Sequence, residues 1–556
     1  MMKTITNILR SCLVCCCITA TLASCSDMMD IDNDRVAYDE QHRIDNPNDS
    51  IYSVMGILAQ LQQVADRVVL MGELRADLMT VDPQYASTDL QDIESLSYTN
   101  DNVYARDIDF YAIINNCNYI LQRMDTSLVE GQTKVMMPEY AQVKTLRAYT
   151  YWQMAQIFGQ VSYFTEPLLS SMSSYHDDRQ TLGIDALAPL LIADLEPLVD
   201  ERPLDYGSVD GWNSSEFFLP TRMLLGDLYL YSNRYEEAAQ AYYDLIQQRR
   251  LTVSSGYANT WMTVARTSLN ANNQQAFRNE VITRQVFDSD LRSLHSQLGK
   301  LTYSDEPSLL PAAHFTSWMQ QRTHFHTDNG QGISRYFTGD LRGLAEMSTG
   351  KQVAQAFGPA DAEQIPGATS SRLLITKYFN NLEGSTTDQL SQRTLRSLPL
   401  VRPTTVYLRY AEAINRAGFP TAAFAVLKYG LSNQTLGDTL RVDSNEVKRM
   451  PRYLDFRASQ FDGNVGTSAR GIGLGVRWDK EQYVIPADAD TVDFVERAIL
   501  DELAAESCFE GNRFFDLLCA SHHRQDHPAL MAELTARKQG DARRGELLQR
   551  FTQLLK

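Results

Sequence analysis

Apolar and small residues recur at the spacing of a helix face along much of the chain, most regularly between residues 220 and 246. The positions that make this pattern are Leu225, Gly226, Tyr229, Ala238, Tyr242 and Leu245. The small residues Gly226 and Ala238 would let two helices approach closely, and Asn233-Arg234 offers a turn between them. The segment is therefore predicted to form a helical hairpin.

A second copy of the pattern follows later in the chain, with Gly418-Phe419-Pro420 at the turn. Its matching positions are Ala411, Ile414, Ala423 and Leu427. These offsets are typical of tetratricopeptide units, which stack side by side into arrays. We expect such units near residues 220–246 and 405–431, with a more degenerate one near 105–160.

Two stretches, 83–102 and 254–400, differ in kind because they are rich in Ser, Thr, Asn, Gly and aromatic residues. Both exceed the roughly 15 residues beyond which a simple connection is uncommon. Short helices and a few strands, such as 280–287, are expected there, and we place the ligand surface on these irregular insertions. The predicted fold class is mostly α, with helical hairpins, long irregular excursions and a few short strands.

The first 24 residues have the pattern of an export signal, with Lys3 and Arg10 before an apolar run from Ser11 to Thr21. The run is shorter than the roughly 20 residues that span a bilayer. Leu22-Ala23-Ser24-Cys25 then supplies the small residues that a lipoprotein signal peptidase needs, so Cys25 is predicted to be lipidated. An ordinary secretory signal with an incidental cysteine is the alternative.

Residues 25–45 begin with a polar, acidic tract and are expected to form a flexible tether, and residues 46–556 one binding domain. Acyl chains on Cys25 would fasten this domain to a membrane while the body stays in water.

The composition excludes some partners and scaffolds. A net charge of −18 and a pI near 5.0 argue against nucleic acid, which basic patches bind. Only Cys117, Cys508 and Cys519 lie beyond the leader and Cys25, so a dense disulfide framework is excluded.

Several polar clusters could indicate a catalytic or metal-binding site, and each also has a structural interpretation. Glu510, Arg513 and Asp516 share one face of a predicted helix and are interpreted as an ion-pair network rather than a catalytic set. The segment 488–493 has calcium-like carboxylate spacing but no glycine at the sixth position, so it is expected to cap a helix from about Val492.

The histidines and glycines are likewise interpreted as structural. His522, His523, Asp526 and His527, and His324 to Asp328, lack the partners of a zinc site, so a solvated terminus and a polar loop are expected. Gly471 to Gly475 lacks the Lys-Ser/Thr step of a phosphate loop and is expected to form a flexible turn. No catalytic residue, metal or cofactor is predicted.

Several blocks, nearly all in family order, resemble the SusD/RagB lipoproteins, which are surface partners of TonB-dependent transporters. They are Gly72-Glu73-Leu74-Arg75-Ala76-Asp77, Asn116-Cys117-Asn118, Lys144-Thr145-Leu146-Arg147-Ala148-Tyr149, Asn279-Glu280-Val281-Ile282, Asp340-Leu341-Arg342, Leu408-Arg409-Tyr410-Ala411-Glu412-Ala413 and Phe509-Glu510-Gly511-Asn512-Arg513-Phe514-Phe515-Asp516-Leu517. The acidic tract after Cys25 also resembles the surface-export signal of Bacteroides lipoproteins.

The resemblance implies a protein lipid-anchored to the outer membrane and facing the cell exterior. It would capture an oligosaccharide, or a peptide, and deliver it to a SusC/RagA-like TonB-dependent transporter without cleaving it. A surface glycoside hydrolase and a tetratricopeptide scaffold that binds only protein remain open as alternatives.

Sugars are bound by aromatic faces, with polar groups taking their hydroxyls. Trp152 lies within a predicted helix and is expected in the core. The ligand-binding candidates are Arg75, Asp77, Tyr85, Tyr98, Tyr104, Trp212, Tyr303, Trp318 and Tyr336.

Overall fold

The computed structural model of the chain describes residues 43–169, 179–253, 280–287, 296–328, 333–352, 369–380, 397–472, 483–524 and 528–554. The expected leader, Cys25 and nearly all of the expected tether lie outside these residues. Helices dominate the described part and its strands are short, which confirms the predicted fold class. None of the described helices has both the length and the apolar character needed to cross a membrane.

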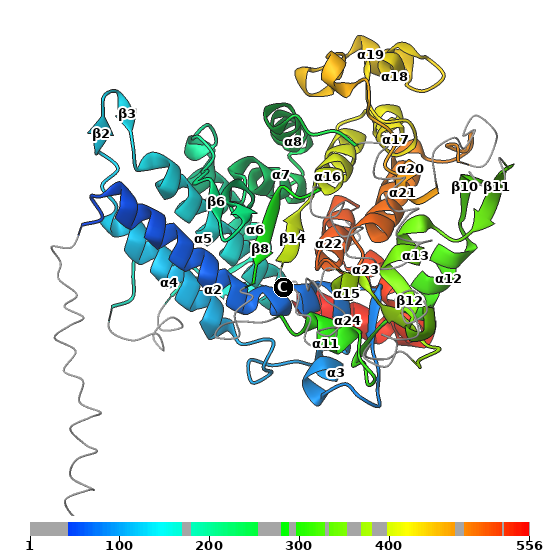
Figure 1. Cartoon of the computed structure of the whole chain (residues 1–556), viewed down its shortest axis with the longest axis horizontal. Coiled ribbons are helices and arrows are strands. Elements are labelled where there is room, and N and C mark those ends of the chain that lie inside the picture. The colour runs from blue at the N-terminus through cyan, green and yellow to red at the C-terminus, as the bar shows by residue number, and fades with distance from the viewer. Residues whose placement is uncertain are drawn as a thin grey trace, which may run out of the picture.

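Pairs of neighbouring helices form the repeated unit of the body. The three pairs are α4 (Asp107–Arg123) with α5 (Met137–Phe158), α7 (Thr221–Tyr231) with α8 (Tyr235–Arg249), and α16 (Pro403–Arg416) with α17 (Pro420–Lys428). They coincide with the expected units. Helix α6 (Ile184–Leu195) contacts both α5 and α7, and α8 contacts α16, so the pairs continue into one array (Figure 1).

The close approach of α7 and α8 depends on Gly226. A Cβ at this position would lie 2.4 Å from the ring of Tyr242, whose hydroxyl donates to Asp227 at 2.6 Å. Asn233 adopts a left-handed conformation (φ 59°) between the two helices, as the predicted turn requires. Trp152 of α5 packs edge-on against Tyr231, which confirms its place in the core.

The first and last parts of the described chain meet. Helix α2 (Pro47–Leu74) packs against α22 (Arg513–His523), and the Glu73 carboxyl accepts the Gly511 N–H at 2.7 Å. A Cβ on Gly72 would lie 1.8 Å from the Gly511 carbonyl oxygen, so α2 crosses this turn with no side chain between them.

The C-terminal helices pack in sequence beside α2 and the array. They are α21 (Thr491–Glu506), α22, α23 (Ala529–Gln539) and α24 (Arg544–Leu554). Asp490 accepts the Asp493 N–H at 3.0 Å, which confirms the predicted cap.

Seven two-stranded antiparallel sheets lie within the described residues, and several join distant segments. The pairs are β1 (Met79–Val81) with β9 (Leu309–Pro311), β2 (Val129–Glu130) with β3 (Thr133–Lys134), β4 (Gln160–Ser162) with β5 (Thr181–Gly183), β6 (Ser208–Val209) with β7 (Trp212–Asn213), β8 (Thr283–Val286) with β14 (Ser397–Val401), β10 (Thr323–Asp328) with β11 (Ile333–Thr338), and β12 (Met347–Thr349) with β13 (Leu373–Ile375). Strand β8 confirms the strand expected at 280–287.

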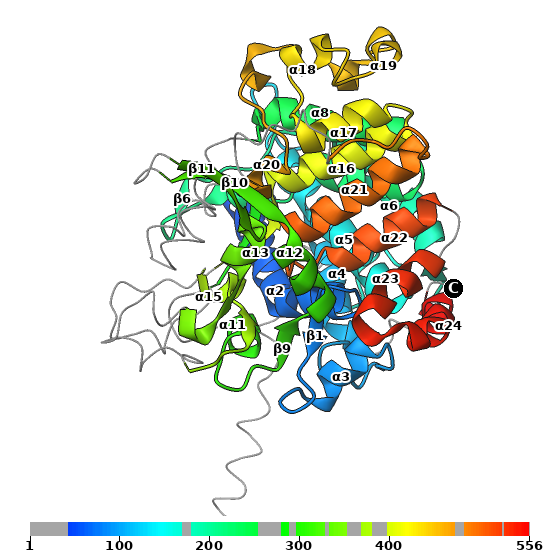
Figure 2. The same cartoon turned by 90° about the vertical axis from the view of Figure 1, so that its right-hand side faces the viewer.

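Short helices complete the structure. They are α3 (Thr88–Glu94), α11 (Leu298–Thr302), α12 (Ala313–Gln321), α13 (Leu341–Glu346), α15 (Lys377–Asn380), α18 (Asn433–Gly437), α19 (Ser444–Lys448) and α20 (Ala469–Ile472), together with one-turn helices at 196–198, 214–216, 452–454, 459–461 and 541–543. The mixture of short helices and strands expected in the irregular insertions is present in their described parts. Helices α18 and α19 form a lobe at one edge of the molecule (Figures 1 and 2).

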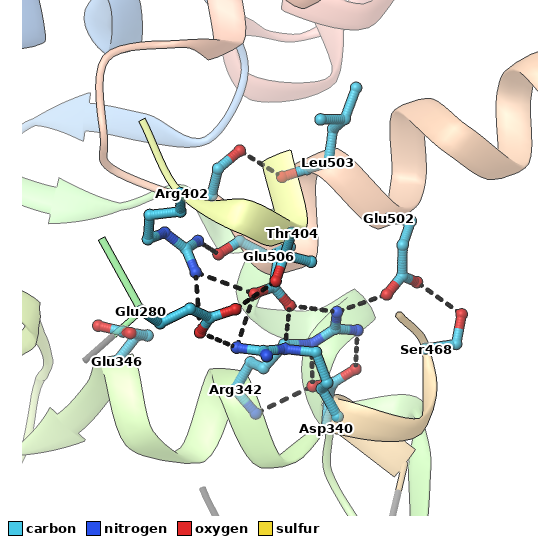
Figure 3. Close-up of polar contacts among 12 residues, drawn as sticks. Glu280, Asp340, Arg342, Glu346, Arg402, Thr404, Ser468, Glu502, Leu503 and Glu506 are labelled. Carbon is cyan, nitrogen blue, oxygen red and sulfur yellow. Dashed lines mark hydrogen bonds and ion pairs between the residues drawn. The ribbon is translucent and has the colours of Figure 1, made fainter. Parts of the chain in front are cut away.

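A buried group of charged side chains, here called the charge cluster, fastens the long insertion to the helices (Figure 3). Its members are Glu280, Asp340, Arg342, Arg402, Arg470, Glu502 and Glu506. The Arg342 guanidinium donates to Asp340 at 3.0 Å, to Glu502 at 2.5 Å and to Glu506 at 3.1 Å. Burial opposes ionisation of Glu506, but the guanidinium groups of Arg470, Arg402 and Arg342 hold its pKa well below the ordinary value.

Two expectations for glycine and acidic segments need correction. Gly471 lies in the short helix α20, not in a turn, and a Cβ there would lie 2.3 Å from Asp340, so it allows close packing on the charge cluster. The rest of the expected turn, residues 473–475, lies outside the described residues. Glu510 precedes α22 instead of sharing it, because Phe509 and Gly511 have positive φ.

The interpretation of the acidic segment as an ion-pair network is confirmed, with partners on other segments. Glu510 pairs with Lys377 at 2.7 Å, and Arg513 with Asp77 at 2.7 Å. Asp516 lies 3.9 Å from Arg409.

The expected polar loop and solvated terminus need correction at His324 and His523, which are buried, and at His522, which is half-buried. His324 lies in strand β10 instead of a loop, and its Nδ1 is 2.7 Å from the Gly339 carbonyl. His522 stacks on Tyr231, and His523 is buried beside Glu412 and Leu230. Packing of α22 against α7 covers both rings, whereas Asp526 and His527 lie outside the described residues.

Candidate ligand-binding site

A cavity of about 430 Å³ opens between α12, α21 and α23, which lie beside one another in Figure 2. This volume is within the range of roughly 300–1,000 Å³ typical of small-molecule sites. Its lining residues are Asp77, Leu78, His314, Phe315, Trp318, Arg497, Leu500, Asp501, Ala504, Arg513, Leu530, Leu534 and Arg537. The leucines and Ala504 form an apolar wall, and aromatic and charged groups provide the rest.

Asp77 and Arg513 form a buried ion pair in the cavity wall. Arg513 donates from Nε to Asp77 Oδ1 at 2.7 Å and from Nη2 to Oδ2 at 3.1 Å. The nearest His314 nitrogen, Nε2, lies 3.8 Å from Asp77 Oδ2. Burial opposes ionisation of Asp77, but Arg513 and then His314 hold its pKa well below the ordinary value. Asp77 is therefore a fixed carboxylate.

The rim of the cavity is more open and also charged. Arg497 and Asp501 lie one turn apart on α21, Arg537 faces them from α23, and all three are exposed to solvent. Protein atoms nevertheless crowd Asp501, and this desolvation raises the pKa of its carboxyl against the opposing charges of Arg513, Arg322 and Arg537.

Trp318 supplies the largest aromatic surface of the cavity. Phe315 stacks on it with ring centroids 6.0 Å apart, and the Arg322 guanidinium lies 4.8 Å from the centre of its ring. Arg322 in turn pairs with Asp340 of the charge cluster at 3.0 Å. The indole is thus held in place from behind by buried charges while part of it lines the cavity, which is an arrangement suited to stacking on a ligand ring.

The structure brings two of the nine sequence candidates, Asp77 and Trp318, into this cavity. Tyr336 lies on β11, in the hairpin that follows α12, and is 57% exposed. Its ring packs edge-on against Phe325, its partner across the hairpin. The prediction that Tyr336 contacts ligand stays a prediction.

Arg75 and Tyr98 come together elsewhere, in a structural role. Buried Arg75 donates to the Gln156 carbonyl at 2.8 Å and lies over the Phe514 ring at 3.7 Å. The Tyr98 hydroxyl donates to the Ile157 carbonyl at 2.7 Å and accepts from Arg75 at 3.3 Å.

The four remaining candidates do not line the cavity. Tyr303 is buried, Tyr104 is partly buried against the core, and the Tyr85 hydroxyl accepts from the Gln84 side chain at 3.1 Å. Trp212 lies in the β6–β7 hairpin, and the Arg284 guanidinium lies 4.9 Å from its ring centre.

Five polar or aromatic lining residues were not singled out from the sequence: His314, Phe315, Arg497, Asp501 and Arg537. Arg497 and Asp501 show the i, i+4 spacing of an ordinary solvated helix face, so the sequence carries no signal that sets them apart. Only the packing of α12 and α23 across from them creates a site.

Metal and thiol chemistry find no support among the described residues. No group of three or more His, Cys, Asp or Glu side chains there is arranged to hold a metal ion. Cys117, Cys508 and Cys519 are buried free thiols, and burial raises the pKa of Cys117 to about 12.

Comparison with solved structures decides the fold. A SusD superfamily protein from Bacteroides vulgatus superposes with a TM-score of 0.57 at 14% identity, over 91% of this chain and 92% of that one. The chain has the SusD-like fold. No protein-family model and no curated protein matches the sequence.

Two further structures with the SusD-like fold are described by what they bind. A SusD-like carbohydrate binding protein from Bacteroides fragilis gives a TM-score of 0.56 at 12% identity, covering 86% of this chain and 87% of that one. Surface glycan-binding protein A from Bacteroides fluxus gives 0.53 at 15% identity, covering 89% and 91%. The resemblance found in the sequence is thus confirmed at the level of the fold.

Proposed function

We propose that the protein binds a glycan in the cavity beside Trp318 and acts as a surface lipoprotein that passes an oligosaccharide to a TonB-dependent outer-membrane transporter. The observation that carries the binding role is an open cavity of about 430 Å³ with an indole held in its wall. The carbohydrate-binding descriptions of proteins with the same fold support the ligand class.

The lipid anchor, the outer-membrane location and the transporter partner rest on the sequence. Leu22-Ala23-Ser24-Cys25 and the acidic tract after it support anchoring at the cell surface.

Hydrolysis is a second candidate, because the cavity holds two carboxyl groups whose pKa values are shifted in opposite directions. Asp77 is kept ionised and Asp501 has a raised pKa, as a nucleophile and an acid would need. Both Asp77 oxygens, however, are engaged by Arg513. We therefore favour binding without cleavage, and release of new reducing ends from a bound oligosaccharide would overturn that preference.

The test of glycan binding is the substitution Trp318→Ala. Loss of a stacked indole is expected to weaken oligosaccharide binding about 2- to 10-fold or more, since aromatic stacking contributes roughly 0.5–1.5 kcal/mol beyond buried area. The measurement is calorimetric titration with oligosaccharides identified on a glycan array.

The matched control is Tyr52→Ala, because Tyr52 is an aromatic residue of α2 that is 76% exposed and is not among the residues that line the cavity. This variant should bind as the parent does. Equal affinity of all three proteins, or absence of any glycan ligand, would contradict the proposal.

A further inference from the structure

Two arginines of the cavity, Arg497 and Arg537, have no ion-pair partner among the described residues. Asp493 and Glu533 lie one turn before Arg497 and Arg537 on the same helices, but they do not pair with these two arginines. Asp493 and Glu533 each pair with a different arginine, at 3.3 Å and 3.4 Å. Both Arg497 and Arg537 therefore present unpaired guanidinium groups at the rim of a concave site.

The charge balance of the cavity is opposite in sign to that of the chain. Three arginines and two aspartates line the cavity, and the Asp77–Arg513 pair neutralises itself. Asp501 offsets only one of the two rim arginines. The lining thus carries a local positive excess in a chain of net charge −18, and a concave site with such an excess attracts anions.

We propose that the cavity selects oligosaccharides that carry carboxylates, that is, glycans containing uronic acid units. This inference rests on the glycan-binding role proposed above and names the class of glycan. The planar guanidinium groups of Arg497 and Arg537 match the two oxygens of a carboxylate, which they can hold by paired N–H donors.

The other groups of the cavity suit the rest of such a ligand. Trp318 offers a ring face to the C–H side of a sugar, and Asp501 and His314 offer polar atoms to its hydroxyls. His314 Nδ1 is a buried nitrogen with no hydrogen-bond partner within the described part of the chain. A neutral sugar would use the stacking surface but leave both rim arginines without a counter-charge.

The experiment compares each acidic ligand with a neutral form of the same ring. The full chain, purified in detergent, is titrated with oligomers of galacturonate, glucuronate and mannuronate and with their methyl esters. At least one free acid should bind about tenfold or more tightly than its ester, because hydrogen bonds to charged groups are the stronger ones. Rising salt concentration should weaken binding of the free acid and leave binding of the ester nearly unchanged.

The double variant Arg497→Gln, Arg537→Gln should lose this preference while keeping the parent unfolding curve, since both side chains are exposed. The double variant Arg43→Gln, Arg457→Gln removes the same charge from exposed pairs at 3.1 Å and 2.7 Å that do not line the cavity, and should keep the preference.

Three results would overturn the inference. Tight binding of neutral oligosaccharides alone would leave the glycan-binding role standing and reject the acidic ligand. Tighter binding of peptides ending in a free carboxylate than of any uronate would reject the glycan and keep the anion site. Binding of no glycan of either kind would reject the proposed function itself.

Discussion

Gly72 has no room for a methyl group, because α2 crosses the turn before α22 at this residue. Replacing it with alanine would put a Cβ 1.8 Å from the Gly511 carbonyl oxygen, a backbone atom that cannot rotate away. Gly72→Ala is expected to lower the free energy of unfolding by about 1–3 kcal/mol, the usual effect of overpacking. Urea denaturation followed by circular dichroism measures it.

Gly56→Ala is the matched control, because Gly56 lies in the same helix and a Cβ there meets nothing within 4 Å. Alanine favours a helix over glycine, so this variant should gain roughly 0.5–1 kcal/mol. Equal effects of the two substitutions would mean that α2 does not approach Gly511 as closely as described.

Glu346 should make stability depend on pH. Burial raises the pKa of its carboxyl from 4.5 to about 7, against the opposing charge of Lys377 at 3.6 Å. The folded protein then keeps a proton that the unfolded chain releases above pH 4.5. The stabilising contribution is full below pH 4.5 and is lost as the pH rises through about 7.

Glu346→Gln removes this ionisation, so the free energy of unfolding should fall less between pH 4.5 and pH 7.5, by up to about 3 kcal/mol. Lys377 keeps its partner Glu510 at 2.7 Å in this variant. Urea midpoints across that pH range measure the slope. The exposed substitution Glu236→Gln should follow the parent, and an unchanged slope in Glu346→Gln would refute the assignment.

Helices α13 and α21 are joined by buried charges rather than by apolar contact alone. Arg342→Met would leave Asp340, Glu502 and Glu506 with too few positive partners in the interior. Breaking one side of a buried ion network typically costs about 3–5 kcal/mol, so a loss of that size is expected. Hydrogen exchange should show faster opening of α13, with α7 and α8 little changed.

Arg457→Met provides the comparison, because its pair with Asp455 at 2.7 Å is solvent-exposed. Exposed pairs contribute about 0–1 kcal/mol, so this variant should unfold close to the parent. Two results would contradict this role of the charge cluster in holding the insertion against α21. One is a similar loss of stability in both arginine variants, and the other is hydrogen exchange that rises evenly over the molecule.

Sequence and structure agree best where a contact is local. The hairpin at 220–246, its turn at Asn233 and the cap at Asp490 follow from spacing within a few residues, and all are present. The residues of the family-like blocks, such as Glu280 and Arg342, prove to be buried partners in the charge cluster. Two other block residues, Asp77 and Arg513, form the ion pair in the cavity wall, but no block contains Trp318 or the rim arginines.

The cavity could not be foreseen because its walls come from segments far apart along the chain. Asp77 lies just beyond α2, Trp318 on α12, and the rim arginines on α21 and α23. Each of these helices has an unexceptional pattern by itself. The helix expected through Glu510 also failed for a non-local reason, since the positive φ of Gly511 serves the crossing with α2.

For the whole molecule, the proposed lipid anchor rests on one residue, Cys25, which precedes the described residues. Cys25→Ala should abolish incorporation of labelled palmitate and shift the protein out of the membrane pellet, because stable anchoring needs acyl chains. Cys16→Ala changes a cysteine of the leader instead and should leave labelling intact. Retention of label in Cys25→Ala would show that lipid is attached elsewhere or that another residue begins the mature protein.

The packing of α2 against α22 has a consequence for biogenesis. A polypeptide emerging from a translocation pore exposes α2 first, yet the walls around Asp77 are complete only when α21, α22 and α23 have followed. Chains cut short by stalled synthesis or by proteolysis before α23 therefore lack the recognition surface altogether. The glycan binding proposed above would therefore require synthesis and folding to have reached α23.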